Sequence, residues 1–174
     1  MGTYGVRRAL LPLTVVTLIV VAVQLVIFSS WRFDGVVVMM VWLWPLAVGM
    51  TGRTALALWC ATVAGVLFDT HSSAPFGLTV LVALTIAYAA SRLGSEGVGD
   101  LDSAAWWVTP LIGAVAGFVA PALYVGLSLF TLNFTFWRDG LWAAMLVNTV
   151  AFFLLVRPAT RVAQWVVGAG GARR

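Results

Sequence analysis

The sequence predicts an all-α membrane protein with six transmembrane helices, and its composition and apolar runs lead to this fold class. Hydrophobic residues make up 62% of the 174 residues and charged residues only 9%, whereas soluble domains carry about 25% charged residues. A helix needs about 20 apolar residues to cross a bilayer, so six spans use roughly 120 residues. The remaining residues suffice only for loops and tails. We therefore predict a single integral membrane domain over residues 1–174.

The boundaries of the spans follow from the polar residues that interrupt the apolar runs. The first apolar run follows Arg7 and Arg8. Because it is longer than the apolar core of a signal peptide and no cleavage site follows it, we predict an uncleaved membrane span. A proline, Pro45, is expected to bend the second span. After Arg157 and Pro158, residues 159–167 could form a short interfacial helix. The expected spans are residues 9–28, 35–50, 54–69, 76–92, 104–130 and 141–157.

The arginines predict the orientation of the chain. All ten basic residues are arginine, and in a six-span layout eight of them share a side with the N-terminus. Only Arg32 and Arg138 fall in the opposite loops. Because cytoplasmic loops are enriched in positive charge, we expect both termini in the cytoplasm. The arginines are scattered at the ends of apolar runs, so the net charge of +4 does not indicate a nucleic-acid surface.

The stretch from residue 57 to residue 91 is the most informative part of the chain, and it predicts a tightly packed helical hairpin. Small residues recur every four positions and lead to an aspartate on the same helix face. After a short polar turn, a second apolar helix carries its own stripe of small residues. The first stripe consists of Ala57, Ala61, Gly65 and Asp69, and the second of Thr79, Ala83, Ala87 and Ser91.

Asp69 and its neighbour His71 are the candidates for polar chemistry. Acidic residues are rare in membrane spans and usually functional, but Asp69 lies near a span end where solvation alone could explain it. His71 could pair with Asp69 as a proton relay, although a histidine beside two loop serines is more often simply solvated. No second polar cluster is present to hold a substrate, and Cys60 is the single cysteine. The residues therefore favour a protein that is not an enzyme and has neither metal nor cofactor.

Close helix contact is also expected in the fifth span. Gly113 and Gly117 form a GxxxG pattern there, which we interpret as packing within the bundle, although the pattern also occurs at intermolecular contacts.

Several of these residues resemble the rod shape-determining protein MreD family. The signature region is Gly65-x-x-x-Asp69 followed by Pro75-Phe76-Gly77-Leu78 and then Ala87-Tyr88. Further similarity lies in Arg32-Phe33-Asp34, in Trp42, in Asn148 and in the basic tail that begins at Arg157, which extends the likeness over most of the chain. Phe33 departs from the proline that many members of the family have at this place.

The resemblance implies a membrane scaffold of the bacterial cell-elongation machinery. Proteins of this family bind the single-span periplasmic protein MreC and act with the MreB filament, the glycosyltransferase RodA and a class B penicillin-binding protein. The likeness implies a place in the bacterial cytoplasmic membrane, a role in peptidoglycan synthesis and cell shape, and a fold similar to the substrate-binding component of energy-coupling-factor transporters. Residues expected to bind the partner or to pack the bundle are Asp69, Gly65, Ala61, Gly77, Asp34 and Asn148, and replacing Asp69 or Gly65 by leucine is expected to weaken the complex.

Two other functions remain open at this point. The first is a vitamin-binding component of an energy-coupling-factor transporter, which shares the implied fold. Against it, the first span lacks an Ala-x-x-x-Ala docking surface, since Ala9 and Ala22 are far apart. The second is a small intramembrane enzyme that uses Asp69 and His71. A bound small molecule would favour the transporter component, whereas an MreC-like chain would favour the scaffold.

Overall fold

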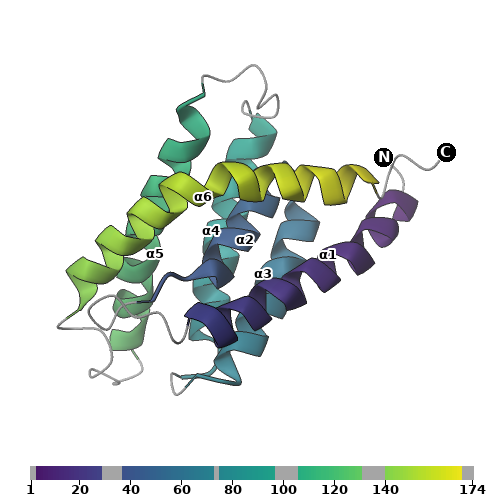
Figure 1. The fold of residues 1–174 in the computed structure, drawn as a ribbon. Coiled ribbons are helices and arrows are strands. Elements are labelled where there is room, and N and C mark those ends of the chain that lie inside the picture. The colour runs from purple at the N-terminus through teal and green to yellow at the C-terminus, as the bar shows by residue number, and fades with distance from the viewer. Residues whose placement is uncertain (1–2, 29–36, 73–74, 97–105, 131–139, 170–174) are drawn as a thin grey trace.

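The computed structural model describes residues 3–28, 37–72, 75–96, 106–130 and 140–169 (Figure 1). Helices account for all the regular secondary structure of these residues. The elements, in chain order, are α1 (Thr3–Val23), the short π-helix η1 (Gln24–Phe28), α2 (Met40–Gly49), α3 (Thr54–Asp69), α4 (Leu78–Glu96), α5 (Val108–Leu129) and α6 (Leu141–Ala169).

Four segments of the described chain are helical, long and apolar enough to cross a membrane. They lie in α1 with η1, in α4, in α5 and in α6, and their hydropathy is highest for the span Ala9–Ile27. The helices α2 and α3 are also apolar but have only 10 and 16 residues. The protein is therefore a helical, multi-pass membrane protein, and its described residues form four long helices and two shorter ones, α3 with the bounds expected for the third span.

Several expected boundaries differ from the structure, among them the start of the second span and the end of the sixth. The second span was expected over 35–50, but residues 37–39 are not helical and α2 begins only at Met40. The separate interfacial helix expected over 159–167 does not form, because α6 continues through Pro158 to Ala169. Its second half keeps one buried face that includes Thr160, Ala163 and Val166. Packing of this face holds the helix together despite the missing N–H of the proline.

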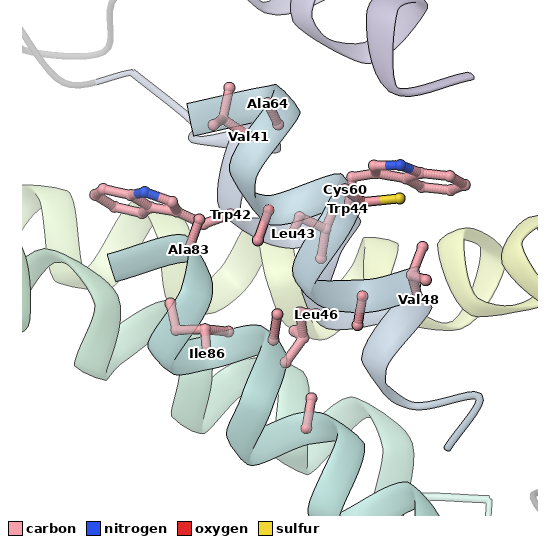
Figure 2. Close-up of a cluster of buried hydrophobic side chains, with 14 of the residues drawn as sticks. Val41, Trp42, Leu43, Trp44, Leu46, Val48, Cys60, Ala64, Ala83 and Ile86 are labelled. Carbon is pink, nitrogen blue, oxygen red and sulfur yellow. The ribbon is translucent and has the colours of Figure 1, made fainter. Parts of the chain in front are cut away.

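The short helix α2 forms the centre of the bundle. Every residue from Val41 to Gly49 is buried, and the helix contacts α1, α3, α4, α5 and α6. Trp42 and Trp44 project from opposite sides of α2, and Cys60 of α3 lies beside Trp44 (Figure 2). A helix that is apolar on all sides is expected to lie in the core of a large bundle, and α2 occupies this position.

The helix ends gather at two opposite ends of the bundle (Figure 1). The turn between α2 and α3 lies against the end of α4, since a Cβ atom on Gly94 would stand 2.7 Å from the carbonyl oxygen of Met50. The turn between α3 and α4 lies at the other end. The start of α1 and the end of α6 lie at the same end of the bundle as the α2–α3 turn (Figure 1). The helices α1 and α6 also contact each other.

The long helices α5 and α6 form an antiparallel pair. A Cβ atom on Gly113 would stand 2.8 Å from the carbonyl oxygen of Phe152, and one on Gly117 would collide with the backbone of Asn148. Only glycine allows the two backbones to approach this closely. The prediction that the GxxxG pattern packs within the bundle is confirmed.

Candidate functional site

The Asp69 carboxylate ties the end of α3 to the start of α4. Its Oδ2 atom accepts a hydrogen bond of 2.8 Å from the backbone N–H of Gly77, whose own carbonyl oxygen accepts the first helical bond of α4 from Leu81. Gly77 has a φ of 93°, a conformation that favours glycine. A negative charge beside a helix N-terminus is also stabilised by the helix dipole. Asp69 is thus a buried capping group, with 4% of its surface exposed.

The small-residue stripe that precedes Asp69 lies in the interior. Ala57 and Ala61 are completely buried, and Gly65 is buried as well. A Cβ atom on Gly65 would stand 2.6 Å from Cα of Val80 and 2.9 Å from its backbone nitrogen. Real Cβ atoms do not approach backbone so closely, so Gly65 sets the distance between α3 and α4.

The second stripe lies in the same interior and also faces α2. Ala83, Ala87 and Ser91 have no exposed surface, and a Cβ atom on Gly49 of α2 would stand 2.7 Å from the carbonyl oxygen of Ala87. Small side chains on α4 thus bring it close to two helices at once. The result is a compact unit of α2, α3 and α4.

Asp69 belongs to a group of four buried polar and aromatic side chains, which we call the polar cluster. It consists of Trp42 on α2, Asp69 on α3, Thr79 on α4 and Tyr124 on α5. Tyr124 interacts electrostatically with Asp69, and its hydroxyl lies near that of Thr79. The rings of Trp42 and Tyr124 have centroids 5.7 Å apart and are tilted by 49°. Tyr124 of α5 therefore neighbours side chains from α2, α3 and α4.

Asn148 belongs to a second buried polar site, which caps α2. Its Oδ1 atom accepts a hydrogen bond of 2.8 Å from the backbone N–H of Met39, and its Nδ2 atom donates to the carbonyl oxygen of Ala144 at 2.9 Å. Gln24 of η1 completes the cap, because its Oε1 atom accepts from the N–H of Met40 at 2.7 Å. The first N–H groups of a helix lack partners within that helix, and here two side chains from distant helices supply them.

The structure does not pair His71 with Asp69. His71 is exposed, and its Nδ1 atom lies 2.9 Å from the carbonyl oxygen of Leu67 and 3.1 Å from the hydroxyl of Thr70. Among the described residues, no three His, Cys, Asp or Glu side chains gather as they would to hold a metal ion. Asp34, expected to contribute to partner binding or packing, lies outside the described residues.

Two further hydrogen bonds that the sequence reasoning missed connect α1 to the core. Trp44 donates its indole N–H to Thr17 at 2.9 Å, and Trp59 donates to Thr14 at 3.0 Å. Both threonines also donate to carbonyl oxygens of their own helix. Their spacing of three residues on α1 places them on one face, and this spacing is the sequence signal that could have identified them.

The fold and the polar side chains define a multi-pass helical membrane protein whose buried polar groups fix the positions of its helices. Comparisons of the chain with protein families, with curated proteins and with solved structures find no match.

Proposed function

We propose that this chain is a non-catalytic membrane scaffold of the MreD type, which binds an MreC-like partner in the machinery of bacterial cell elongation. The observation that carries the proposal is the α3–α4 hairpin. The residues from Gly65 to Leu78 that resemble the MreD family are the residues that shape it. Gly65 permits the close helix contact, and Asp69 and Gly77 close the turn by a hydrogen bond.

The use of polar side chains supports a scaffold. Gln24 and Asn148 bond to the backbone of α2, or of the residue before it, and Asp69 bonds to the backbone at the start of α4. Each bond joins elements that are separate in the chain. These side chains are thus employed in holding helices in place, which suits a protein that presents a fixed surface to other chains in the bilayer.

The proposed location is the bacterial cytoplasmic membrane with both termini in the cytoplasm. Arg53 directly precedes α3 and Arg92 lies near the end of α4, so these two exposed residues belong to the end of the bundle opposite the α3–α4 turn. Positive charge favours the cytoplasmic side, so the turn with Asp69 faces outward in this orientation. A periplasmic partner with one membrane span could then contact the hairpin and its rim.

Phe76 is the residue best suited to test partner binding. Leucine at Gly65 would collide with α4 and leucine at Asp69 would break the bond to Gly77, so both changes affect the fold itself. Phe76, by contrast, lies in the same signature with 68% of its surface exposed. Exposed aromatic residues frequently dominate the energy of an interface.

The experiment is co-purification of Phe76→Ser with a co-expressed MreC-like chain in mild detergent. We expect retention of the partner to fall about tenfold, the equivalent of about 1.4 kcal/mol. Trp165→Ser is the matched control, because Trp165 is also an exposed aromatic residue, with 74% of its surface exposed, and lies near the C-terminal end of α6. Equal retention by both variants and by the unchanged chain would contradict this surface. Failure of the unchanged chain to retain any MreC-like chain would contradict the scaffold function.

A further inference from the structure

Three polar atoms in the described part of the chain are buried without a hydrogen-bond partner, and all three belong to the polar cluster. They are Trp42 Nε1, Asp69 Oδ1 and Thr79 Oγ1. Trp42 and Thr79 have no exposed surface and Asp69 has 4%. Buried polar groups in proteins are nearly always hydrogen-bonded, and leaving one without a partner costs about 1–3 kcal/mol.

Tyr124 connects the three residues in space. Its ring packs against that of Trp42, while its hydroxyl lies near Thr79 and interacts with the charge of Asp69. The three residues that carry the atoms without partners are therefore all neighbours of one aromatic side chain, and they lie on helices α2, α3 and α4. A common ligand between them is a simpler account than three separate defects.

The chemistry of the three atoms determines what such a ligand must be. An indole N–H only donates, an ionised carboxylate oxygen only accepts, and a threonine hydroxyl does both. A metal cation would suit the two oxygens but not the N–H group, and an anion would be repelled by Asp69. A water molecule donates and accepts, and buried water typically makes about three hydrogen bonds.

We propose that Trp42, Asp69 and Thr79 form a binding site for one internal water molecule beside Tyr124. The water accepts from Trp42 Nε1 and donates to Asp69 Oδ1, with Thr79 Oγ1 as its third partner. Since Tyr124 borders the site, the water also fixes the place where α5 joins α2 and α4. This inference does not depend on the proposed scaffold function.

A double-mutant cycle on the full chain in detergent tests the site, with the melting temperature as readout. Trp42→Phe removes the indole donor and Thr79→Val removes the hydroxyl, and each keeps most of the shape of the side chain. We expect each substitution to lower the melting temperature by several degrees. Because both act through the same water, the second should lower it by half as much or less once the first is present. Residues that share no partner give additive effects.

Two control pairs calibrate the cycle. Trp44→Phe with Thr17→Val breaks a direct hydrogen bond and should be coupled. Trp44→Phe and Thr79→Val change residues that belong to different clusters, so their effects on the melting temperature should be additive. Additive effects of Trp42→Phe and Thr79→Val overturn the proposal. If either variant does not fold, a high-resolution density map of the unchanged chain decides, because the proposal requires a peak within about 3.2 Å of all three atoms.

Sodium and choline buffers distinguish water from a cation. The proposal requires the melting temperature to be the same in both at equal ionic strength. A higher value in sodium that disappears in Asp69→Asn would assign the site to a cation and overturn the water.

Discussion

At the scale of single residues, two amide side chains, Asn148 and Gln24, form hydrogen bonds with backbone groups of other segments. Asn148 uses both ends of its amide, accepting from Met39 and donating to Ala144. Gln24 accepts from the next backbone N–H, that of Met40. In a bilayer there is no water to satisfy such backbone groups, so each must find a partner within the protein. The start of α2 is therefore stable only where these two side chains meet it.

Replacing Asn148 by leucine tests this role. The change leaves the N–H of Met39 buried without its acceptor, so we expect the free energy of unfolding to fall by about 1–3 kcal/mol. Chemical or thermal unfolding in detergent measures the change. Thr149→Val serves as the control, because the Thr149 hydroxyl bonds only to the carbonyl oxygen of Met145 in its own helix. Equal stability of the two variants would show that the cap does not stabilise α2.

The sequence predicts the positions of some buried residues but not the hydrogen-bond partners of others. The spacing of Ala57, Ala61, Gly65 and Asp69 on one face follows from helix geometry alone, and the structure places all four in the interior. The hydrogen-bond partners of Asn148 and Gln24 could not be derived in the same way. Their partners, Met39 and Met40, lie at the start of α2, 109 and 16 residues away in the chain, and no local pattern encodes such a pairing.

At the scale of helices, close contacts through small residues determine how the elements pack. Gly65 brings α3 to α4, Gly49 brings α2 to α4, and Gly117 brings α5 to α6. Membrane helices gain little from burying apolar surface against one another, so close van der Waals packing contributes much of their association. Helix existence was predictable from apolar runs. The start of α2 was not, because tertiary hydrogen bonds and not the apolar run determine it.

Adding one methyl group to Gly65 tests the α3–α4 contact. In Gly65→Ala the new Cβ would stand 2.6 Å from Cα of Val80, so the helices must separate, and we expect a loss of about 1–3 kcal/mol of stability. Gly126→Ala is the matched control within a helix, since nothing lies within 4 Å of its Cβ position. There, alanine should be neutral or stabilise by up to about 1 kcal/mol, because it favours helices. A neutral Gly65→Ala in an unfolding assay would refute the close contact.

At the scale of the whole molecule, the helix ends divide the bundle into two faces. The α2–α3 turn and the end of α4 lie on one face and the α3–α4 turn on the other (Figure 1). The apolar composition predicted a membrane bundle, and four long helices support it. Composition could not indicate that α2 would be enclosed by the other helices, because enclosure depends on how they assemble.

Labelling of single cysteines in cells tests the orientation of the two faces. Cys60 is buried and free and is first replaced by alanine. Ser72→Cys near the α3–α4 turn should react with an impermeant maleimide in intact spheroplasts, whereas Ser95→Cys near the end of α4 should react only after permeabilisation. Reaction of both positions from outside would rule out the six-span topology with cytoplasmic termini.

The enclosed position of α2 has a consequence for biogenesis. A helix of 10 residues is about 15 Å long, half the thickness of the hydrocarbon layer, so it is poorly suited to enter the bilayer alone. Its cap also draws on Asn148 of α6, which lies 109 residues further along the chain than Met39. We infer that the middle of the bundle is completed only after the ribosome has released α6, and that chains truncated before α6 become substrates for membrane proteases.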